Sequence, residues 1–210
     1  MPNILCFGDS NTFGTNPSGG RWPREVRWPG ALQTRLGSDY YVIEEGLGGR
    51  TTVMEDTLEP DKNGRRHLPV ALRSHRPLDL VVIMLGSNDM KHRFSLLPAD
   101  IARGAAELGA LVESCPYGPA YPTPRVLLIS PPHLGEGIEH SPYSGFTARA
   151  VEVSKQLAPL YRDICAARGW LYLDAARVAV PSERDSLHLE AESHLALAEA
   201  VEKLVREAFA

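Results

Sequence analysis

The stretch Ile4-Leu5-Cys6-Phe7-Gly8-Asp9-Ser10-Asn11-Thr12 decides how the rest of the chain is interpreted. The four apolar residues predict a buried strand, and the residues from Gly8 onward predict a tight turn. In a parallel sheet the carboxyl ends of the strands face the ligand-binding crevice, and the next helix directs free backbone N–H groups to the same place. Ser10 is therefore a candidate nucleophile, although Ser10 or Asn11 could instead cap the next helix.

Short apolar runs alternate with segments of helical period along the whole chain. We expect five strands, at about 4–7, 41–43, 80–85, 126–129 and 170–173. We expect helices at about 29–36, 67–75, 98–112, 147–167 and 189–209, with Pro159 kinking or dividing the fourth. This alternation predicts an α/β fold of three layers, α/β/α, in which helices cover both faces of a mostly parallel five-stranded sheet.

The composition is that of an ordinary globular protein. The chain has 210 residues, of which 43% are hydrophobic and 23% charged, and its formal net charge is -4. This length predicts one domain, 1–210, and the charge shows no basic excess for binding nucleic acid. No apolar stretch is long enough to cross a membrane, and the three cysteines are too widely spaced to predict a disulfide framework, so we expect a cytoplasmic protein.

A nucleophilic serine needs a general base, an orienting acid and donors for the developing oxyanion. Asp185 and His188 stand just before the last expected helix, at a spacing that lets the carboxylate accept the Nδ1 proton of the imidazole. The glycines at 48–49 follow the second strand and let backbone N–H groups approach a ligand, and the amide of Asn88 follows the third strand. Taken alone, each feature also fits a structural role as a helix entry, a turn or a cap.

Together these motifs resemble those of the SGNH hydrolases, a subdivision of the GDSL esterase and lipase family. The blocks occur in the family's order over nearly the whole chain: Gly8-Asp9-Ser10, Gly48-Gly49-Arg50-Thr51, Gly86-x-Asn88-Asp89 and Asp185-x-x-His188. The resemblance implies a flavodoxin-like SGNH hydrolase fold. It also implies a catalytic triad of Ser10, Asp185 and His188, and an oxyanion hole made by Ser10, Gly49 and Asn88.

Other stretches resemble the bacterial arylesterases within this family, a group that includes an acyltransferase and perhydrolase described in mycobacteria. They are Cys6-Phe7-Gly8-Asp9-Ser10, Glu44-Glu45-Gly46-Leu47, Leu78-Asp79-Leu80-Val81 and Ile83-Met84-Leu85-Gly86. The resemblance implies a serine esterase that acts on small acetyl-type or aryl esters through an acyl-enzyme, with acyl transfer or perhydrolysis as a further activity. It also implies a homo-oligomer, for example an octamer, with an interface at the loop 131–146.

Three long loops, at 15–28, 50–66 and 131–146, are expected to form the walls of a pocket. Apolar side chains in or beside these loops favour a narrow pocket for a short acyl chain or an aryl leaving group. The candidates are Trp22, Trp28, Phe94, Leu134, Ile138, Tyr143 and Phe146, together with Asp9, Phe13 and Leu187 beside the motifs. Loop packing or subunit contact would explain any one of them equally well.

Two other functions stay open at this point. A carbohydrate O-acetyl esterase would need the same five motif residues and would differ only in its pocket. A non-catalytic module that binds a small ligand would use the glycine-rich turns but would give Asp185 and His188 no role. We expect no cofactor and no metal, because His188, Glu190 and His194 lack the H-E-x-x-H spacing.

Overall fold

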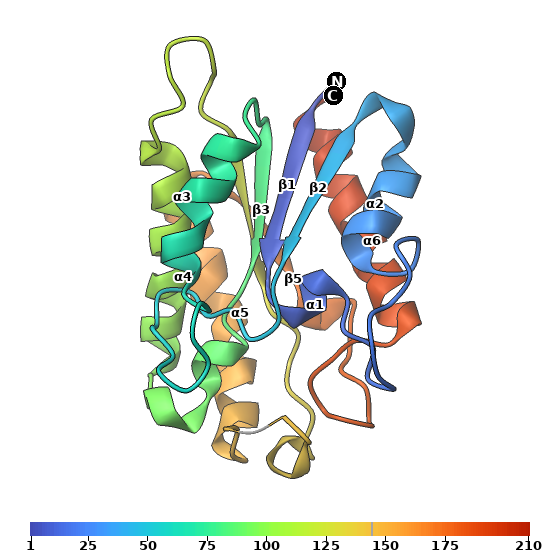
Figure 1. Cartoon of the computed structure of the whole chain (residues 1–210), viewed down its shortest axis with the longest axis vertical. Helices are drawn as coiled ribbons and strands as arrows, with labels where there is room; N and C mark the ends of the chain where they lie inside the picture. Colours follow the sequence, from blue (N-terminus) through green and yellow to red (C-terminus); the bar gives the residue numbers. More distant parts are fainter. Residues whose placement is uncertain (144) are drawn as a thin grey trace.

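A parallel sheet forms the centre of the computed structural model, which describes residues 1–143 and 145–210 (Figure 1). Its five strands lie in the order β2-β1-β3-β4-β5, and every neighbouring pair is parallel. The strands are β1 (Asn3–Gly8), β2 (Tyr41–Gly46), β3 (Leu80–Met84), β4 (Arg125–Ser130) and β5 (Leu171–Asp174). The predicted α/β class with a five-stranded parallel sheet is confirmed.

Helices cover both faces of this sheet, which gives the three predicted layers. On one face lie α2 (Trp28–Leu36) and α6 (Ala191–Ala208), and on the other lie α3 (Gly64–Ser74), α4 (Pro98–Ser114) and α5 (Arg149–Arg168) (Figure 1). A short helix, α1 (Ser10–Phe13), directly follows β1. Within the described residues, no helix combines the length and apolar character that crossing a bilayer requires.

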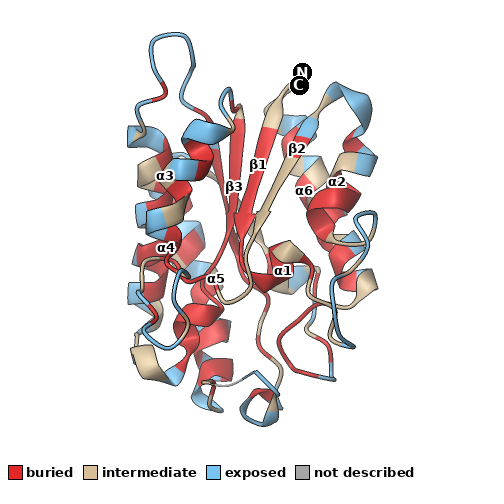
Figure 2. Ribbon diagram, in the orientation of Figure 1, coloured by how far each residue is buried: buried red, intermediate tan, exposed pale blue. Residues whose placement is uncertain are grey.

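The inner strands are buried on both faces because each contributes to two separate cores. Leu5 and Phe7 of β1 belong to the core under α3, α4 and α5, whereas Ile4 and Cys6 belong to the core under α2 and α6. Side chains alternate between the faces of a strand, so a strand with a core on each side is apolar at every position. Figure 2 shows this burial along the strands and on the helix surfaces that face them.

Two helices differ from the sequence-based expectation. The sequence predicts a kink or a division at Pro159, and α5 runs through Pro159 as one helix, so Pro159 does not divide it. Proline removes one N–H from a helix of 20 residues, and the packing of α5 against α4, β4 and β5 compensates for that loss. Helix α3 begins at Gly64, before the expected start at 67, because Asn63 caps it by accepting a hydrogen bond from the Arg65 N–H.

The register of the sheet brings three of the sequence motifs to one edge. Gly8 at the end of β1 pairs with Gly46 of β2 and with Met84 of β3, so the segments that follow these strands leave the sheet at the same level. The chain after β1 leads to α2 on one face, and the chain after the neighbouring β3 leads to α4 on the other face. Open α/β sheets of this strand order bind ligands at such a point. Helix α1 lies at this edge, and both termini lie at the opposite one (Figure 1).

Candidate active site

Ser10 is the first residue of α1, immediately beyond the carboxyl end of β1. Asp9 caps the helix, because its Oδ1 accepts a hydrogen bond of 3.0 Å from the Asn11 N–H. Gly8 allows the turn to sit tightly on the sheet, since a Cβ there would lie 2.8 Å from the Met84 carbonyl oxygen. Asp9 thus takes the capping role, and the Ser10 side chain is left to line a pocket.

Asp185 and His188 form a buried hydrogen-bonded pair in the segment before α6. Asp185 Oδ2 lies 2.7 Å from His188 Nδ1, and Oδ1 accepts the backbone N–H groups of Leu187 and His188 at 3.0 and 2.9 Å. Burial raises the pKa of Asp185, but hydrogen bonds from His188 and the backbone outweigh burial and hold this pKa below its ordinary value. The ionised carboxylate therefore favours the tautomer with the proton on Nδ1, which leaves Nε2 as the basic atom.

Asn11 connects the serine turn to the histidine segment. Its Nδ2 donates to the Leu187 carbonyl at 3.2 Å, and its Oδ1 accepts the Leu189 N–H at 3.1 Å. Asn11 is 2% exposed, so water does not compete for these bonds. The residue after Ser10 thus holds the backbone on both sides of His188, a role that the sequence did not indicate.

Gly49 and Asn88 lie on the same pocket as Ser10. Gly49 has a φ of 80°, a left-handed conformation that glycine adopts without Cβ strain. Asn88 Nδ2 donates to the Arg50 carbonyl at 3.2 Å, which places the amide beside the Gly49 turn and leaves its second N–H available. The next residue, Asp89, is fully buried and accepts the Thr52 N–H at 3.0 Å, so the segments after β2 and β3 are tied together.

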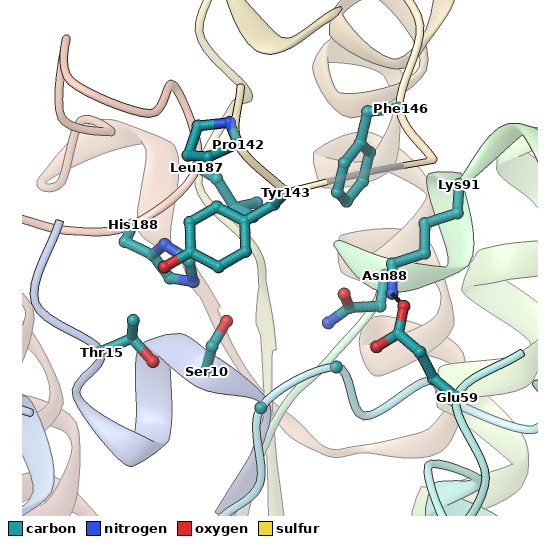
Figure 3. Close-up of a pocket in the computed structure, with 12 residues that line it drawn as sticks. Ser10, Thr15, Glu59, Asn88, Lys91, Pro142, Tyr143, Phe146, Leu187 and His188 are labelled. Atoms are coloured by element: carbon teal, nitrogen blue, oxygen red, sulfur yellow. Dashed lines mark hydrogen bonds and ion pairs between the residues drawn. The ribbon is translucent and has the colours of Figure 1, made fainter. Parts of the chain in front are cut away.

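A pocket of about 340 Å³ opens at this edge of the sheet (Figure 3). It is lined by Ser10, Thr15, Gly48, Gly49, Glu59, Asn88, Lys91, Pro142, Tyr143, Phe146, Leu187 and His188. Each of the three long loops contributes to the wall, and Ser10 and His188 face the same space in Figure 3. Among the hydrogen bonds of the described residues, none joins the Ser10 hydroxyl to the His188 ring.

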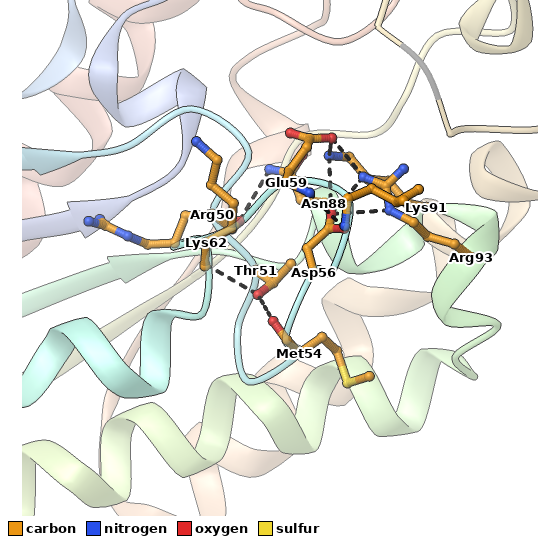
Figure 4. Close-up of polar contacts among 10 residues, drawn as sticks. Arg50, Thr51, Met54, Asp56, Glu59, Lys62, Asn88, Lys91 and Arg93 are labelled. Carbon is orange, nitrogen blue, oxygen red and sulfur yellow. Dashed lines mark hydrogen bonds and ion pairs between the residues drawn. The ribbon is translucent and has the colours of Figure 1, made fainter.

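The wall of the pocket has an apolar part and a charged part. Tyr143 packs edge-to-face on His188, with ring centroids 4.5 Å apart, and Pro142, Phe146 and Leu187 complete the apolar part. Glu59 and Lys91 form the charged part and are joined by a hydrogen bond of 2.7 Å (Figure 4). The pocket can therefore hold a ligand with both an apolar group and a polar group.

Several of the expected pocket residues lie in the protein core instead. Leu134 and Ile138 are buried with the side chains under α3, α4 and α5, and Trp28 is buried under α2 and α6. Of the candidate apolar residues, Tyr143, Phe146 and Leu187 line the pocket. A loop position on the sequence predicts that a segment is near the site, but it does not predict which of its side chains turn inward.

Four other candidates make hydrogen bonds or cation–π contacts with neighbouring residues and do not line the pocket. Trp22 Nε1 donates to the Leu189 carbonyl at 3.1 Å and so supports the segment after His188. Phe13 lies 4.0 Å from the Arg21 guanidinium, and Phe94 lies 5.6 Å from that of Arg93. Asp9 caps α1, as described above. The side chains of Phe13, Trp22, Phe94 and Asp9 are thus not among those that line this pocket.

Sequence reasoning missed Thr15, Glu59, Lys91 and Pro142 as lining residues. Lys91 had a usable signal, because it follows the Gly86-x-Asn88-Asp89 block by two residues. Glu59 had none, since it lies in a loop with several other charged residues and no periodicity.

His188, Glu190 and His194 do not converge on a common point. Glu190 accepts a hydrogen bond of 2.6 Å from the Ser182 hydroxyl, and His194 Nδ1 accepts the Trp28 N–H at 3.3 Å. Within residues 1–143 and 145–210, no three His, Cys, Asp or Glu side chains are grouped to hold a metal ion.

A parallel sheet of this order, with the serine turn after β1 and the Asp-His segment before the last helix, defines an SGNH-type hydrolase. The model of the GDSL-like Lipase/Acylhydrolase family matches residues 6–196. The chain belongs to that family, and it is therefore a hydrolase of carboxylic esters.

Solved structures of esterases are similar to the chain over its whole length. Est24 of Sinorhizobium meliloti, described as a carbohydrate acetylesterase, is 38% identical with a TM-score of 0.91, covering 99% of this chain and 100% of that one. The aryl esterase of M. smegmatis is 37% identical with a TM-score of 0.91, covering 99% of each chain. A lipase/acylhydrolase from Enterococcus faecalis, 19% identical with a TM-score of 0.69, shares the fold.

A more distant relative is the uncharacterized lipoprotein YqeF of Bacillus subtilis (strain 168). It is 29% identical over 87 residues, which are 41% of this chain and 32% of that protein. The matched part of the chain thus spans about a third of the length of this relative.

Proposed function

We propose that the chain is a serine esterase that hydrolyses small acetyl-type and aryl esters through an acyl-enzyme on Ser10. The observation that carries this proposal is the buried Asp185–His188 pair, 2.7 Å between Oδ2 and Nδ1, whose histidine lines the same pocket as Ser10. A pocket of about 340 Å³ is near the small end of the range for ligand sites and suits a small ester.

In the first step, Nε2 of neutral His188 removes the proton of the Ser10 hydroxyl as Oγ attacks the ester carbonyl. The ring becomes positively charged, and the Asp185 carboxylate at Nδ1 stabilises that charge. In an unliganded enzyme the bond between nucleophile and base is often long and shortens when substrate binds. Asn11 and Trp22, which hold the backbone around His188, maintain the ring near Ser10.

The carbonyl oxygen becomes an oxyanion in the tetrahedral intermediate. Its donors are the backbone N–H groups of Ser10 and Gly49 and the free N–H of the Asn88 side chain. The hydrogen bond from Asn88 to the Arg50 carbonyl fixes the amide beforehand, so little reorganisation is needed during the reaction.

His188 then protonates the leaving alcohol, which departs and leaves an ester on Ser10. Water activated by Nε2 attacks this acyl-enzyme, releases the acid and returns the proton to Ser10 through His188. An alcohol in place of water gives an ester as the product, and hydrogen peroxide gives a peracid. Acyl transfer and perhydrolysis are therefore further activities of the same proposed site.

A second candidate function is the removal of O-acetyl groups from carbohydrates. The charged part of the pocket wall, formed by Glu59 and Lys91, offers hydrogen-bonding groups that an aryl ester would not use. The similarity to Est24, described as a carbohydrate acetylesterase, also supports it.

Comparing an aryl acetate with an acetylated sugar tests both candidates. Wild type should release acetate from at least one, and Ser10→Ala should release none. Ser18→Ala, which alters an exposed serine of the loop after α1, is the matched control and should behave as wild type. Turnover confined to the sugar acetate would select the deacetylase, and binding without any turnover would support a non-catalytic ligand-binding module.

A further inference from the structure

The charged part of the pocket wall belongs to a cluster of four side chains (Figure 4). Glu59 Oε1 accepts hydrogen bonds from Lys91 Nζ at 2.7 Å and from Arg93 Nη2 at 2.6 Å. Asp56 Oδ2 accepts from Arg93 Nη2 at 2.6 Å and lies 4.0 Å from Lys91 Nζ. Lys91 and Asp56 are 4% and 2% exposed, whereas the Glu59 side chain is 38% exposed, so the cluster has a buried base and Glu59 lies at its open side.

The charges within this cluster balance, because two carboxylates face an ammonium and a guanidinium. Burial raises the pKa of Glu59, but hydrogen bonds from Lys91 and Arg93 outweigh it and hold that pKa below its ordinary value. The two carboxylates therefore stay ionised, opposite the Lys91 and Arg93 side chains. A neutral group that both donates and accepts hydrogen bonds suits such a set of paired side chains.

Both wall residues keep hydrogen-bonding capacity for such a group. Glu59 makes its two ion pairs through Oε1, and within the described parts of the chain Oε2 has no hydrogen-bond partner. Lys91 Nζ donates one of its three hydrogens to Glu59. Glu59 Oε2 also lies beside the expected oxyanion hole, because a Cβ added to Gly49 would be 3.0 Å from it.

We propose that Glu59 and Lys91 form a subsite for a hydroxyl group of the substrate. Glu59 Oε2 accepts the hydroxyl hydrogen, and Lys91 Nζ donates to the hydroxyl oxygen. The subsite rests on the proposed esterase function and narrows its substrates to esters with a free hydroxyl near the reacting carbonyl. That hydroxyl can belong to the alcohol part, as in a partly acetylated polyol or sugar, or to the acyl part, as in a hydroxy acid.

Two pairs of matched esters test the subsite and identify the source of the hydroxyl. Glycerol monoacetate is compared with propyl acetate, and methyl hydroxybutyrate with methyl butyrate. In one of the pairs, wild type should prefer the hydroxylated ester in kcat/KM by about tenfold to a hundredfold, the effect of a hydrogen bond to a charged group. The pair that shows the preference identifies the part of the substrate that reaches Glu59.

Variants of Glu59 test its role directly. Glu59→Ala should abolish the preference, whereas Glu59→Gln keeps an acceptor without the charge and should retain part of it. Glu55→Ala is the matched control, because Glu55 lies in the same loop, pairs with Arg66 at 3.1 Å and does not line the pocket. The ratio compares two substrates on one preparation, so partial unfolding of a variant does not change it.

Equal kcat/KM within both pairs would overturn the subsite, and so would a preference that Glu59→Ala leaves intact. In either case the measured turnover still supports the esterase function. If no ester is turned over, the esterase function fails and the subsite is tested by binding. Saturation-transfer NMR of Ser10→Ala with glycerol monoacetate and methyl hydroxybutyrate should then show contact to one of these esters that is lost when Glu59→Ala is added. Unchanged contact would contradict the subsite.

Discussion

Asn11 holds the backbone on both sides of His188, through hydrogen bonds of 3.2 Å to the Leu187 carbonyl and 3.1 Å from the Leu189 N–H. Asn11 is the residue after Ser10, so the proposed nucleophile and the proposed base are linked by one buried amide. The two residues are nearly the whole chain apart in sequence, and this link fixes where the ring lies relative to α1. Asn11 is therefore a positioning residue for His188 in the proposed mechanism.

Replacing Asn11 should lower the rate of the chemical step. Asn11→Asp keeps the shape but cannot donate to the Leu187 carbonyl, and Asn11→Ala removes both bonds. We expect kcat to fall by about tenfold to a hundredfold with little change in KM, because a small displacement of the base affects the transition state most. Asn16→Ala is the control, because Asn16 lies half-buried in the loop after α1 and its side chain accepts the local Ser18 N–H, at 2.8 Å. A lower Tm with an unchanged kcat would show that Asn11 only stabilises the fold.

Replacing Asn88 should remove one donor from the oxyanion hole. Asn88→Asp retains the size of the side chain but has no N–H, and Asn88→Ala removes the amide altogether. The loss of one such donor costs about 3 kcal/mol of transition-state stabilisation, or about a hundredfold to a thousandfold in kcat. Steady-state kinetics on an aryl acetate should show this loss with a nearly constant KM. A kcat equal to that of wild type in both variants would exclude Asn88 from the oxyanion hole.

His194 should make the folded state less stable in mild acid. Burial lowers the pKa of His194 from 6.5 to about 3, so the unfolded chain binds this proton more readily. This contribution to stability is fully present above the unfolded pKa and is lost as the pH falls from 6.5 toward about 3. The loss reaches about 2 kcal/mol near pH 5.

Urea unfolding of wild type and His194→Gln at about pH 7 and about pH 5 measures this effect. Wild type should lose more free energy of unfolding between the two conditions than the variant. Burial also raises the pKa of Asp89 to about 6, which adds stability as the pH falls from 6 toward 3.8. Both proteins share this opposing contribution, so it cancels in the comparison. An identical pH dependence of the two proteins would contradict the assignment to His194.

The order of apolar runs and helical segments predicted the sheet and its layers, because buried parallel strands and amphipathic helices leave distinct patterns in the sequence. Interruptions were harder to predict. Pro159 breaks the local rule for a helix, yet the contacts of α5 with the sheet and α4 outweigh the lost hydrogen bond. Local pattern predicted the elements, and tertiary packing decided whether an unfavourable residue such as Pro159 interrupts them.

The sequence predicted that the motif residues lie at one edge of the sheet. Each motif follows a strand, and parallel strands in register end at the same edge. The pocket wall could not be predicted in the same way. Trp22 and Phe94 look on the sequence like pocket residues, but they pack elsewhere, whereas Glu59 lines the pocket without any local signal. Loop conformation depends on hydrogen bonds between distant residues, such as those of Asn11 with Leu187 and Leu189, and no local pattern encodes these pairs.

Covalent labelling with a fluorophosphonate, followed by peptide mass mapping and a rate measurement, tests most directly whether Ser10 and His188 act together. The reagent should modify Ser10 in wild type and leave Ser10→Ala unlabelled, and His188→Ala should react at least about a hundredfold more slowly because it lacks the base. A label on another residue, or equal labelling rates in wild type and His188→Ala, would contradict the claim that Ser10 and His188 act together.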